Sequence, residues 1–578
     1  MRHRLPAALA QPPALVTLVG RDRLERADAD PQMLPSSSSP DPRDGPRDEC
    51  GVFGVYAPGH EVSNLAFFAL SALQHRGQES AGIAAADRGG HIMTRRDLGL
   101  VSQALNENDI VTLGGELAIG HVRYSTTGSN AWENSQPVQR AAGAGGNRRE
   151  LALAHNGNLI NAVELHAALR AMGVSFASTS DSEIIAALIA SHPAERVEEA
   201  AVAVMPQLHG AFSTVLMTKD RVLAMRDPAG LRPLSIGLLA PLVDGDPPRY
   251  CVASETCAFD IIGAEHVRDV RPGEVVLLGE EGLTSLQAVE SVREAFCVFE
   301  YIYFARPDSR FNGTALQVVR GRMGELLARE SPVDADLVIP VPDSGNAAAR
   351  GYARASGLPQ DDGFVKNRYI QRTFIQPGQE LRKHGLRMKF NPLPEVVGGK
   401  RLVVVDDSIV RGTTLRRSIL RILARLNPRK IVIVSTAPQI RYPDCYGIDM
   451  SEIGKFVAFE AAVDLLKESG RTELLGDVYR ACRQEVEEKG TVNHVRRLYE
   501  PFTAEEISAR ISKLVRPTPS EWHGEIEIIF QTIENLHAAV PGHTGDWYFT
   551  GHYPTPGGFR VVNQAYVNYY EKSEGRSY

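Results

Sequence analysis

Leu402-Val-Val-Val-Asp-Asp-Ser-Ile-Val-Arg-Gly-Thr-Thr-Leu415 joins an apolar run, a pair of carboxylates and a small-residue turn. The apolar run predicts a buried parallel strand. Asp406 and Asp407 are costly to bury unpaired, so we expect them at the carboxyl end of this strand, facing a crevice. The turn that follows precedes an expected amphipathic helix over residues 415–426, and a helix start with free N–H groups binds anions. The stretch can therefore hold the hydroxyls and the phosphate of a ribose 5-phosphate.

An ordinary strand–turn–helix with exposed aspartates is the alternative interpretation of the same stretch. A nucleotide P-loop is excluded because Gly-Lys-Ser/Thr is absent. The whole pattern resembles the phosphoribosyl pyrophosphate (PRPP) loop of type I phosphoribosyltransferases. The resemblance implies that Asp406 and Asp407 bind the ribose hydroxyls and Mg²⁺. It also implies a 5-phosphate site in the turn, formed by Ser408, Arg411, Gly412, Thr413 and Thr414.

A second strand–turn–helix precedes this one, with a strand over residues 336–341 and a helix over 347–356. Asp343, Ser344 and Gly345 lie between them, and a flexible glycine beside polar side chains suits a pyrophosphate. By the same resemblance, Ser344 joins the two aspartates at one Mg²⁺ per subunit. The alternation of strands and helices predicts a doubly wound α/β sheet.

Composition excludes several classes of protein. The chain has 578 residues, 43% of them hydrophobic and 23% charged, which predicts two to four domains with full-sized cores. The net charge of −7 gives no indication of nucleic-acid binding. No apolar run approaches the ~20 residues that span a membrane. The scattered cysteines form no CxxC pair, which predicts neither disulfides nor zinc and favours the cytoplasm.

Residues 1–49 are rich in Pro, Arg, Ala and Ser, and we expect them to form a disordered arm. Cys50 then opens a hydrophobic strand, where a lone cysteine is more often a small buried side chain than a nucleophile. Polar stretches downstream change this interpretation, because they follow strand ends and can meet at one site. They are residues 74–83, 120–128, 153–159 and 178–183, the last expected to cap a helix over 184–190 through Asp181 or Ser182.

These stretches together resemble the class II glutamine amidotransferases, from Cys50 to about residue 262. The resemblance implies the four-layer αββα sandwich of the N-terminal-nucleophile hydrolases. It assigns the glutamine α-carboxylate to Arg123, the α-ammonium to Asp181 and the oxyanion hole to Asn156 and Gly157. The last pair alone equally suits a hairpin turn. Because a free α-amino group activates such a nucleophile, Cys50 must become the first residue, and the arm is by implication a propeptide.

The two resemblances divide the chain into an arm (1–49), a glutaminase domain (50–290), a phosphoribosyltransferase domain (291–470) and a helical C-terminal extension packing on the transferase (471–578). A chain with this combination resembles the amidophosphoribosyltransferase family, which implies the first committed step of purine synthesis. Glutamine, PRPP and water would give 5-phosphoribosylamine, glutamate and pyrophosphate, with ammonia passed between the sites. The family further implies purine nucleotides as feedback inhibitors and a homotetramer.

Some members of this family carry a [4Fe–4S] cluster on four cysteines. Cys297 matches the first ligand position, but the others read Asp444, Gly545 and Tyr548, so we expect no cluster. The basic segment 366–393 should be mobile in the free enzyme and close over PRPP, or else be a solvated basic loop. The resemblance at Arg372, Thr373 and Phe374 implies that its closure forms the ammonia channel.

Two other functions are compatible with parts of the chain. A glutamine–fructose-6-phosphate aminotransferase would share the first domain but needs sugar isomerase domains instead of the PRPP loop. A non-catalytic regulator on a phosphoribosyltransferase scaffold would tolerate loss of Cys50 or the aspartates, and both are present.

Overall fold

The computed structural model describes most of the chain after the arm. The described ranges are 49–87, 89–124, 131–142, 149–291, 293–366, 390–412, 415–448, 450–518, 522–540, 542 and 545–573. The predicted site residues Thr413, Thr414, Arg372, Thr373 and Phe374 lie outside them.

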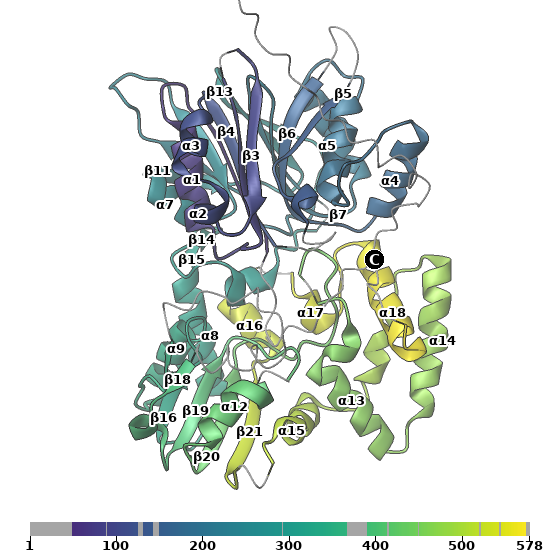
Figure 1. Cartoon of the computed structure of the whole chain (residues 1–578). Helices are drawn as coiled ribbons and strands as arrows, with labels where there is room; N and C mark the ends of the chain where they lie inside the picture. Colours follow the sequence, from purple (N-terminus) through teal and green to yellow (C-terminus); the bar gives the residue numbers. More distant parts are fainter. Residues whose placement is uncertain are drawn as a thin grey trace, which may run out of the picture. The chain divides into compact units, whose positions relative to one another are not determined.

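Two antiparallel sheets form the first half of the described chain (Figure 1). The order in the first sheet is β11 (Ala264–Asp269), β9 (Ser235–Leu239), β10 (Arg249–Ala253), β1 (Gly51–Tyr56), β4 (Leu117–Arg123), β2 (Ser80–Ala86) and β3 (Ile92–Leu98). The order in the second is β13 (Gly282–Gln287), β12 (Glu274–Gly279), β8 (Val222–Arg226), β7 (Gly210–Met217), β6 (Arg149–Leu159) and β5 (Val138–Ala142).

Strand β1 shows why these sheets stack between helices. Its side chains alternate between two cores, and every residue of the strand is buried. Phe53 and Val55 pack under helices α1 (Val62–Ala72) and α7 (Cys257–Ile262), whereas Val52 belongs to the core between the sheets. A Cβ at Gly54 would lie 2.4 Å from Val215 of the opposite sheet, so only glycine permits this approach.

Helices cover the outer face of each sheet. Short helices α2 (Val101–Ala104) and α3 (Glu107–Thr112) accompany α1 and α7 on the first sheet. On the second sheet lie α4 (Ala162–Ala171), α5 (Asp181–Ser191) and α6 (Val197–Val204), and their apolar side chains form one core with β6 and β7. The predicted αββα sandwich is therefore confirmed.

A parallel sheet forms the framework of the second half, in the order β16 (Leu337–Pro340), β19 (Arg401–Asp406), β20 (Lys430–Ser435) and β21 (Glu525–Phe530). Val404 pairs with Ile339 and Ile433, and Ile433 pairs in turn with Ile528. One face of the sheet packs on α8 (Leu316–Glu330) and α9 (Asn346–Ser356). The other packs on α12 (Leu420–Ala424). The predicted α/β transferase sheet is confirmed.

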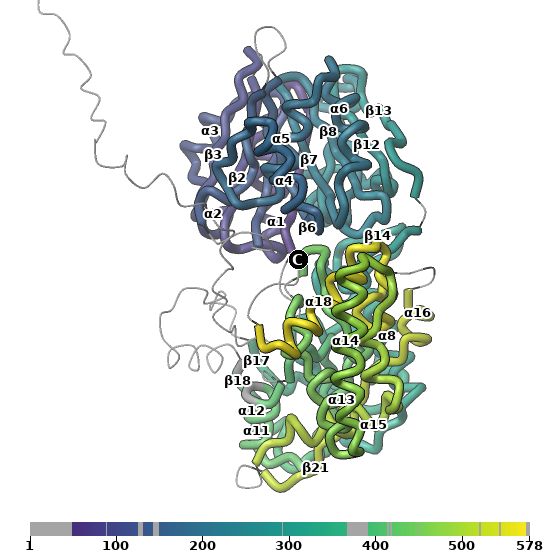
Figure 2. The backbone as a smooth tube through the Cα atoms, turned by 90° about the vertical axis from the view of Figure 1, so that its right-hand side faces the viewer, coloured from purple at the N-terminus to yellow at the C-terminus, as the bar shows by residue number. Residues whose placement is uncertain are grey.

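The helix expected over residues 415–426 is irregular: a π-helical segment, η5 (Leu415–Ile419), precedes α12. Strand β21, within the segment expected to be helical, was not predicted. The remaining helices are α11 (Pro394–Val397), α13 (Val457–Glu468), α14 (Glu473–Glu488), α15 (Ala504–Val515), α16 (Ile533–Ala539), α17 (Trp547–Thr550) and α18 (Pro556–Glu571). Figure 2 shows α14 and α18 side by side. None of the helices in the described ranges is long and apolar enough to cross a membrane.

Short elements complete the described fold. The π-helix η4 (Glu300–Phe304) follows the sandwich, and it precedes the hairpin of β14 (Arg310–Phe311) and β15 (Thr314–Ala315). Strands β17 (Phe364–Lys366) and β18 (Phe390–Pro392) pair with each other at the two ends of the basic segment 366–393. The short 3-10 segments are η1 (Trp132–Asn134), η3 (Met205–Gln207), η6 (Ile453–Lys455) and η7 (His494–Leu498).

Candidate functional sites

Cys50 lies directly before β1, at the end of the sandwich, and is 5% exposed. Its Sγ lies 3.4 Å from the carbonyl oxygen of Tyr124, to which it can donate. Burial raises the pKa of this thiol to about 11, although Arg123 opposes the shift. The charge of Arg123 lowers the pKa of the thiol and that of Asp181 raises it, so two of the predicted glutamine-site residues act electrostatically on Cys50.

Asp181 begins α5, and Ser180 caps this helix by accepting from Ser182 N, so the predicted caps were wrong. The Asp181 carboxylate accepts from Leu159 N at 2.9 Å and pairs with His155 Nδ1 at 3.7 Å. Burial alone would raise the pKa of Asp181, but His155 and the backbone N–H donors outweigh it and leave the pKa below its usual value. Asp181 is thus an anion at neutral pH, as an ammonium partner must be.

Asn156 and Gly157 lie within β6, so they extend a strand instead of forming a hairpin turn. The Nδ2 atom of Asn156 is buried and has no hydrogen-bond partner among the described residues. Such an unsatisfied donor is costly and is a mark of a functional position. Gly157 has φ +141°, and a Cβ there would lie 2.1 Å from the Ala211 carbonyl oxygen, so this backbone requires glycine.

The second site lies where β16 and β19 end side by side, as the sequence predicts for parallel strands. Asp406 ends β19, and Asp407 follows it, 6% exposed. Asp407 accepts hydrogen bonds from Ser408 Oγ at 2.7 Å and from Ser344 Oγ, which joins the two turns. Burial raises the pKa of Asp407, and these hydroxyls only partly offset it.

The glycine and acid of the first turn have clear structural roles. A Cβ at Gly345 would lie 2.5 Å from the carbonyl oxygen of Val405, so glycine allows the first turn to approach the end of β19 closely. Asp343 pairs with Lys366, which ends β17 and is the first residue of the basic segment. In the second turn, Gly412 has φ +56° and follows Arg411.

Sequence reasoning missed a buried arginine close to this site. Arg320 on α8 is 4% exposed and donates to the carbonyl oxygens of Tyr301 and Ala305, each at 2.8 Å. Burial lowers the pKa of Arg320 to about 10. Its positive charge opposes the rise in the pKa of Asp407 that burial causes, although that pKa remains raised. The helical pattern around it gives no signal that separates this arginine from solvent-exposed ones.

The four positions compared with a cluster site are brought together, but by other contacts. Cys297 Sγ lies 3.2 Å from the hydroxyl of Tyr548, and burial raises the thiol pKa to about 12. Asp444 accepts from Trp547 Nε1 at 3.0 Å. A Cβ at Gly545 would lie 1.8 Å from the Phe296 carbonyl oxygen, so this backbone has no room for a cysteine. These residues do not fit a [4Fe–4S] cluster.

A sandwich with a cysteine and a buried amide donor at its end, followed by a carboxylate–hydroxyl site on a parallel sheet, defines a glutamine amidotransferase joined to a phosphoribosyltransferase. Residues 121–259 match the family model described as a glutamine amidotransferase domain. The chain belongs to the amidophosphoribosyltransferase family, the enzymes of the first step of purine biosynthesis.

Similar proteins support this membership along most of the chain. The amidophosphoribosyltransferase of Synechocystis is 48% identical over 73% of this chain and 83% of its own length. The Bacillus subtilis enzyme is 42% identical over 73% and 86%. A solved structure of glutamine PRPP amidotransferase from B. subtilis, complexed with ADP and GMP, matches with a TM-score of 0.70 and 36% identity, covering 88% of this chain and 97% of that one.

Proposed function

We propose that this chain transfers ammonia from glutamine to PRPP, giving 5-phosphoribosylamine, glutamate and pyrophosphate. The observation that carries the proposal is the buried Nδ2 of Asn156, which has no partner within the described ranges, in a chain that also carries Asp407 and Ser344 at paired strand ends. The first feature suits an oxyanion that forms during acyl transfer. The second suits a ribose phosphate.

At the glutamine site, the α-amino group of Cys50 accepts the thiol proton after the arm is removed, and the sulfur attacks the side-chain amide carbonyl. Asn156 Nδ2 and the Gly157 N–H donate to the developing oxyanion. Arg123 binds the α-carboxylate of glutamine, and Asp181 binds its α-ammonium. The tetrahedral adduct collapses to a thioester as its C–N bond breaks, and the leaving nitrogen takes the proton held by the Cys50 α-amino group and departs as ammonia. Water then hydrolyses the thioester to glutamate and restores the thiol.

At the PRPP site, Asp406 and Asp407 accept from the ribose hydroxyls. The second turn (Ser408, Arg411, Gly412, Thr413, Thr414) binds the 5-phosphate, while Asp343, Ser344 and Gly345 face the pyrophosphate. Ser344, Asp406 and Asp407 supply the oxygen ligands that Mg²⁺ prefers, and the ion would neutralise charge on the leaving pyrophosphate. Arg372, Thr373 and Phe374 line the path of ammonia. Purine nucleotides regulate the enzyme, and a cytoplasmic homotetramer is its proposed form.

Cys50→Ser in the fully processed chain tests the assignment of two separate sites. Glutamine-dependent synthesis should be lost, because the nucleophile is gone, whereas synthesis from added ammonium chloride should continue, because PRPP binds elsewhere. Both rates are measured by pyrophosphate release. An equal loss of both rates would contradict the proposal.

A further inference from the structure

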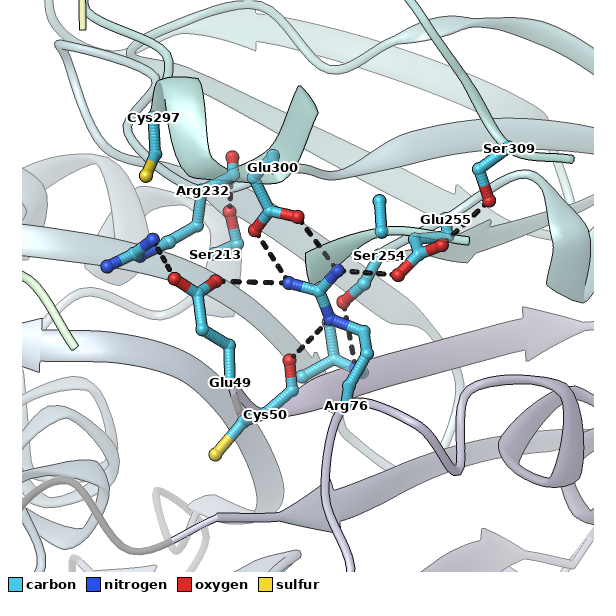
Figure 3. Close-up of polar contacts among 12 residues, drawn as sticks. Glu49, Cys50, Arg76, Ser213, Arg232, Ser254, Glu255, Cys297, Glu300 and Ser309 are labelled. Carbon is cyan, nitrogen blue, oxygen red and sulfur yellow. Dashed lines mark hydrogen bonds and ion pairs between the residues drawn. The ribbon is translucent and has the colours of Figure 1, made fainter. Parts of the chain in front are cut away.

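Glu49, the residue before Cys50, is 1% exposed and lies between two arginines (Figure 3). One carboxylate oxygen accepts from Arg76 Nη2 at 3.1 Å, and the other accepts from Arg232 Nη1. A buried carboxylate is tolerated when it is paired in this way. The last residue of the arm is therefore held in the fold by its side chain.

The Cys50 side of the Glu49–Cys50 peptide bond, called the junction below, is fixed as well. Arg76 Nε donates to the carbonyl oxygen of Cys50 at 2.9 Å, so one guanidinium holds both residues of the junction. Val52 N donates to Ser254 Oγ at 2.9 Å, which anchors the start of β1. Both residues that flank the bond are buried, so a protease cannot bind this junction while it is docked.

The charges around Glu49 are unbalanced in favour of carboxylates. Arg76 also pairs with Glu300 at 2.7 Å and Glu255 at 2.6 Å, and Arg232 lies 3.7 Å from Asp444. His75 and Ser309 also bind Glu255. Burial raises the pKa of Glu49, and the nearby Glu300 raises it further. Hydrolysis of the junction would remove one carboxyl group and create an α-ammonium group on Cys50, which moves the cluster toward balance.

Arg232 connects the junction to the transferase half. Its Nε and Nη2 donate to the carbonyl oxygen of Tyr446 at 3.0 and 2.8 Å. The loop that presents this carbonyl is shaped by Asp444, which accepts from Tyr446 N at 2.9 Å and Ile448 N at 2.7 Å. Glu300, the partner of Arg76, lies in η4, beyond the sandwich. Both arginines that bind Glu49 are thus held in part by residues of the second half of the chain.

We propose that Glu49 is a positioning residue for hydrolysis of the Glu49–Cys50 bond, and that Arg232 makes this hydrolysis conditional on the folded transferase half. The inference rests on the proposed function, in which Cys50 must become the first residue. The Cys50 thiol attacks the Glu49 carbonyl carbon, the C–N bond breaks, and the thiol proton passes to the Cys50 nitrogen. Water then hydrolyses the thioester, leaving a carboxylate on Glu49 and restoring the thiol.

The consequence is that glutamine is hydrolysed only by chains able to use the ammonia. A chain whose second half is incomplete lacks the Tyr446 carbonyl and the Glu300 carboxylate, so Arg232 loses its main-chain acceptor and Glu49 is fixed less firmly. Its arm stays attached, and Cys50 has no free amine to act as a base.

The test follows arm removal in the full-length chain by intact mass after synthesis. Glu49→Ala and Arg232→Met should slow removal by at least about tenfold, because the reacting groups are no longer held together. Asp444→Ala should also slow it, although it is remote in sequence. Asp48→Ala, which changes the neighbouring acid of the arm, and Arg149→Met, which changes an arginine bonded to carbonyls elsewhere in the sandwich, should match wild type.

The glutaminase activity of processed Glu49→Ala is the second readout. Because residue 49 leaves with the arm, the processed product is chemically identical to the wild-type enzyme, so its activity should equal that of wild type even though removal of the arm is slow. Wild-type or faster removal in Glu49→Ala would overturn the inference, and faster removal would show that docking protects the bond. A chain in which an initiator methionine directly precedes Cys50 separates the two proposals. Glutaminase activity in that chain supports the proposed function whatever Glu49 does, and its absence after methionine removal would contradict the proposed function itself.

Discussion

Replacing Asn156 by alanine should separate activity from stability. The buried Nδ2 has no partner in the described structure, so the folded enzyme carries an unsatisfied donor at a cost of about 1–3 kcal/mol. Alanine removes that cost but leaves a small cavity, so the melting temperature should change by no more than about 2–4 °C, equivalent to about 1 kcal/mol. Loss of an oxyanion donor should lower the glutaminase kcat about 10²–10³-fold, or about 2.7–4 kcal/mol.

Asn158, two residues along β6, is the matched control. Its Nδ2 donates to the carbonyl oxygen of Cys445 at 3.0 Å. Asn158→Ala should therefore lower the melting temperature, because it leaves a buried carbonyl without this donor at about 1–3 kcal/mol. Its glutaminase kcat should fall much less than that of Asn156→Ala.

The assay measures glutamate release and thermal unfolding of processed protein, with ammonia-dependent synthesis as the internal standard. If Asn156→Ala destabilised the enzyme as much as Asn158→Ala and kept its glutaminase activity, the oxyanion assignment would be refuted.

Further predictions concern the second site, metal content, the basic segment and the arm. Asp406→Asn and Asp407→Asn should each weaken PRPP binding by about 1.5–3 kcal/mol and impair synthesis from either nitrogen source, and unchanged PRPP affinity in both would count against the site. Anaerobically purified protein should lack visible absorbance, and about four irons per chain would show that a cluster forms despite the residues at its positions. PRPP should protect the segment 366–393 from trypsin and raise glutaminase activity, and Phe374→Ala should uncouple the two; equal cleavage and activity with and without PRPP would leave a simple basic loop. In arm-bearing protein, iodoacetamide should label Cys50 slowly at pH 7.5 and still incompletely at pH 9.5, because the thiol pKa is about 11 and the protonated form persists up to that pH; rapid labelling at pH 7.5, measured by peptide mass, would contradict this.

The sequence predicted those parts of the fold whose cause is local. The apolar run before Asp406 specifies a buried strand, and two carboxylates directly after it can only lie at its end. The sequence also indicated Gly345 and Gly157, although it did not show why glycine is needed. Their backbones approach Val405 and Ala211, and these approaches depend on strand pairing that a linear pattern does not contain.

Features that depend on distant segments could not be predicted. Strand β21 carries a local strand signal in its alternating Glu and Ile residues, which sequence reasoning missed. Its pairing with β20, from which several helices separate it, could not be read from the sequence. The contacts of Glu49 with Arg76 and Arg232 bring together three separate stretches, and no spacing rule links them. Helix α5 begins earlier than its sequence suggests, so Asp181 and Ser182 lie inside it and Ser180 occupies the cap position, while the Asp181 carboxylate binds Leu159 N on β6.

The loop from Asp444 to Ile448 has a consequence for exchanging parts between related enzymes. Arg232 and Asn158 donate to main-chain carbonyl oxygens of this loop, those of Tyr446 and Cys445, which every sequence supplies, and Arg232 also lies 3.7 Å from the Asp444 carboxylate. These hydrogen bonds of the sandwich therefore reach the backbone of this loop and not its side chains at 445 and 446. Asp444 fixes that backbone by accepting from Ile448 N, and Gly447 allows its left-handed conformation, with φ +124°. A chimaera that joins this sandwich to another transferase should tolerate unrelated side chains at 445 and 446, provided that the acid and the glycine flanking them are kept.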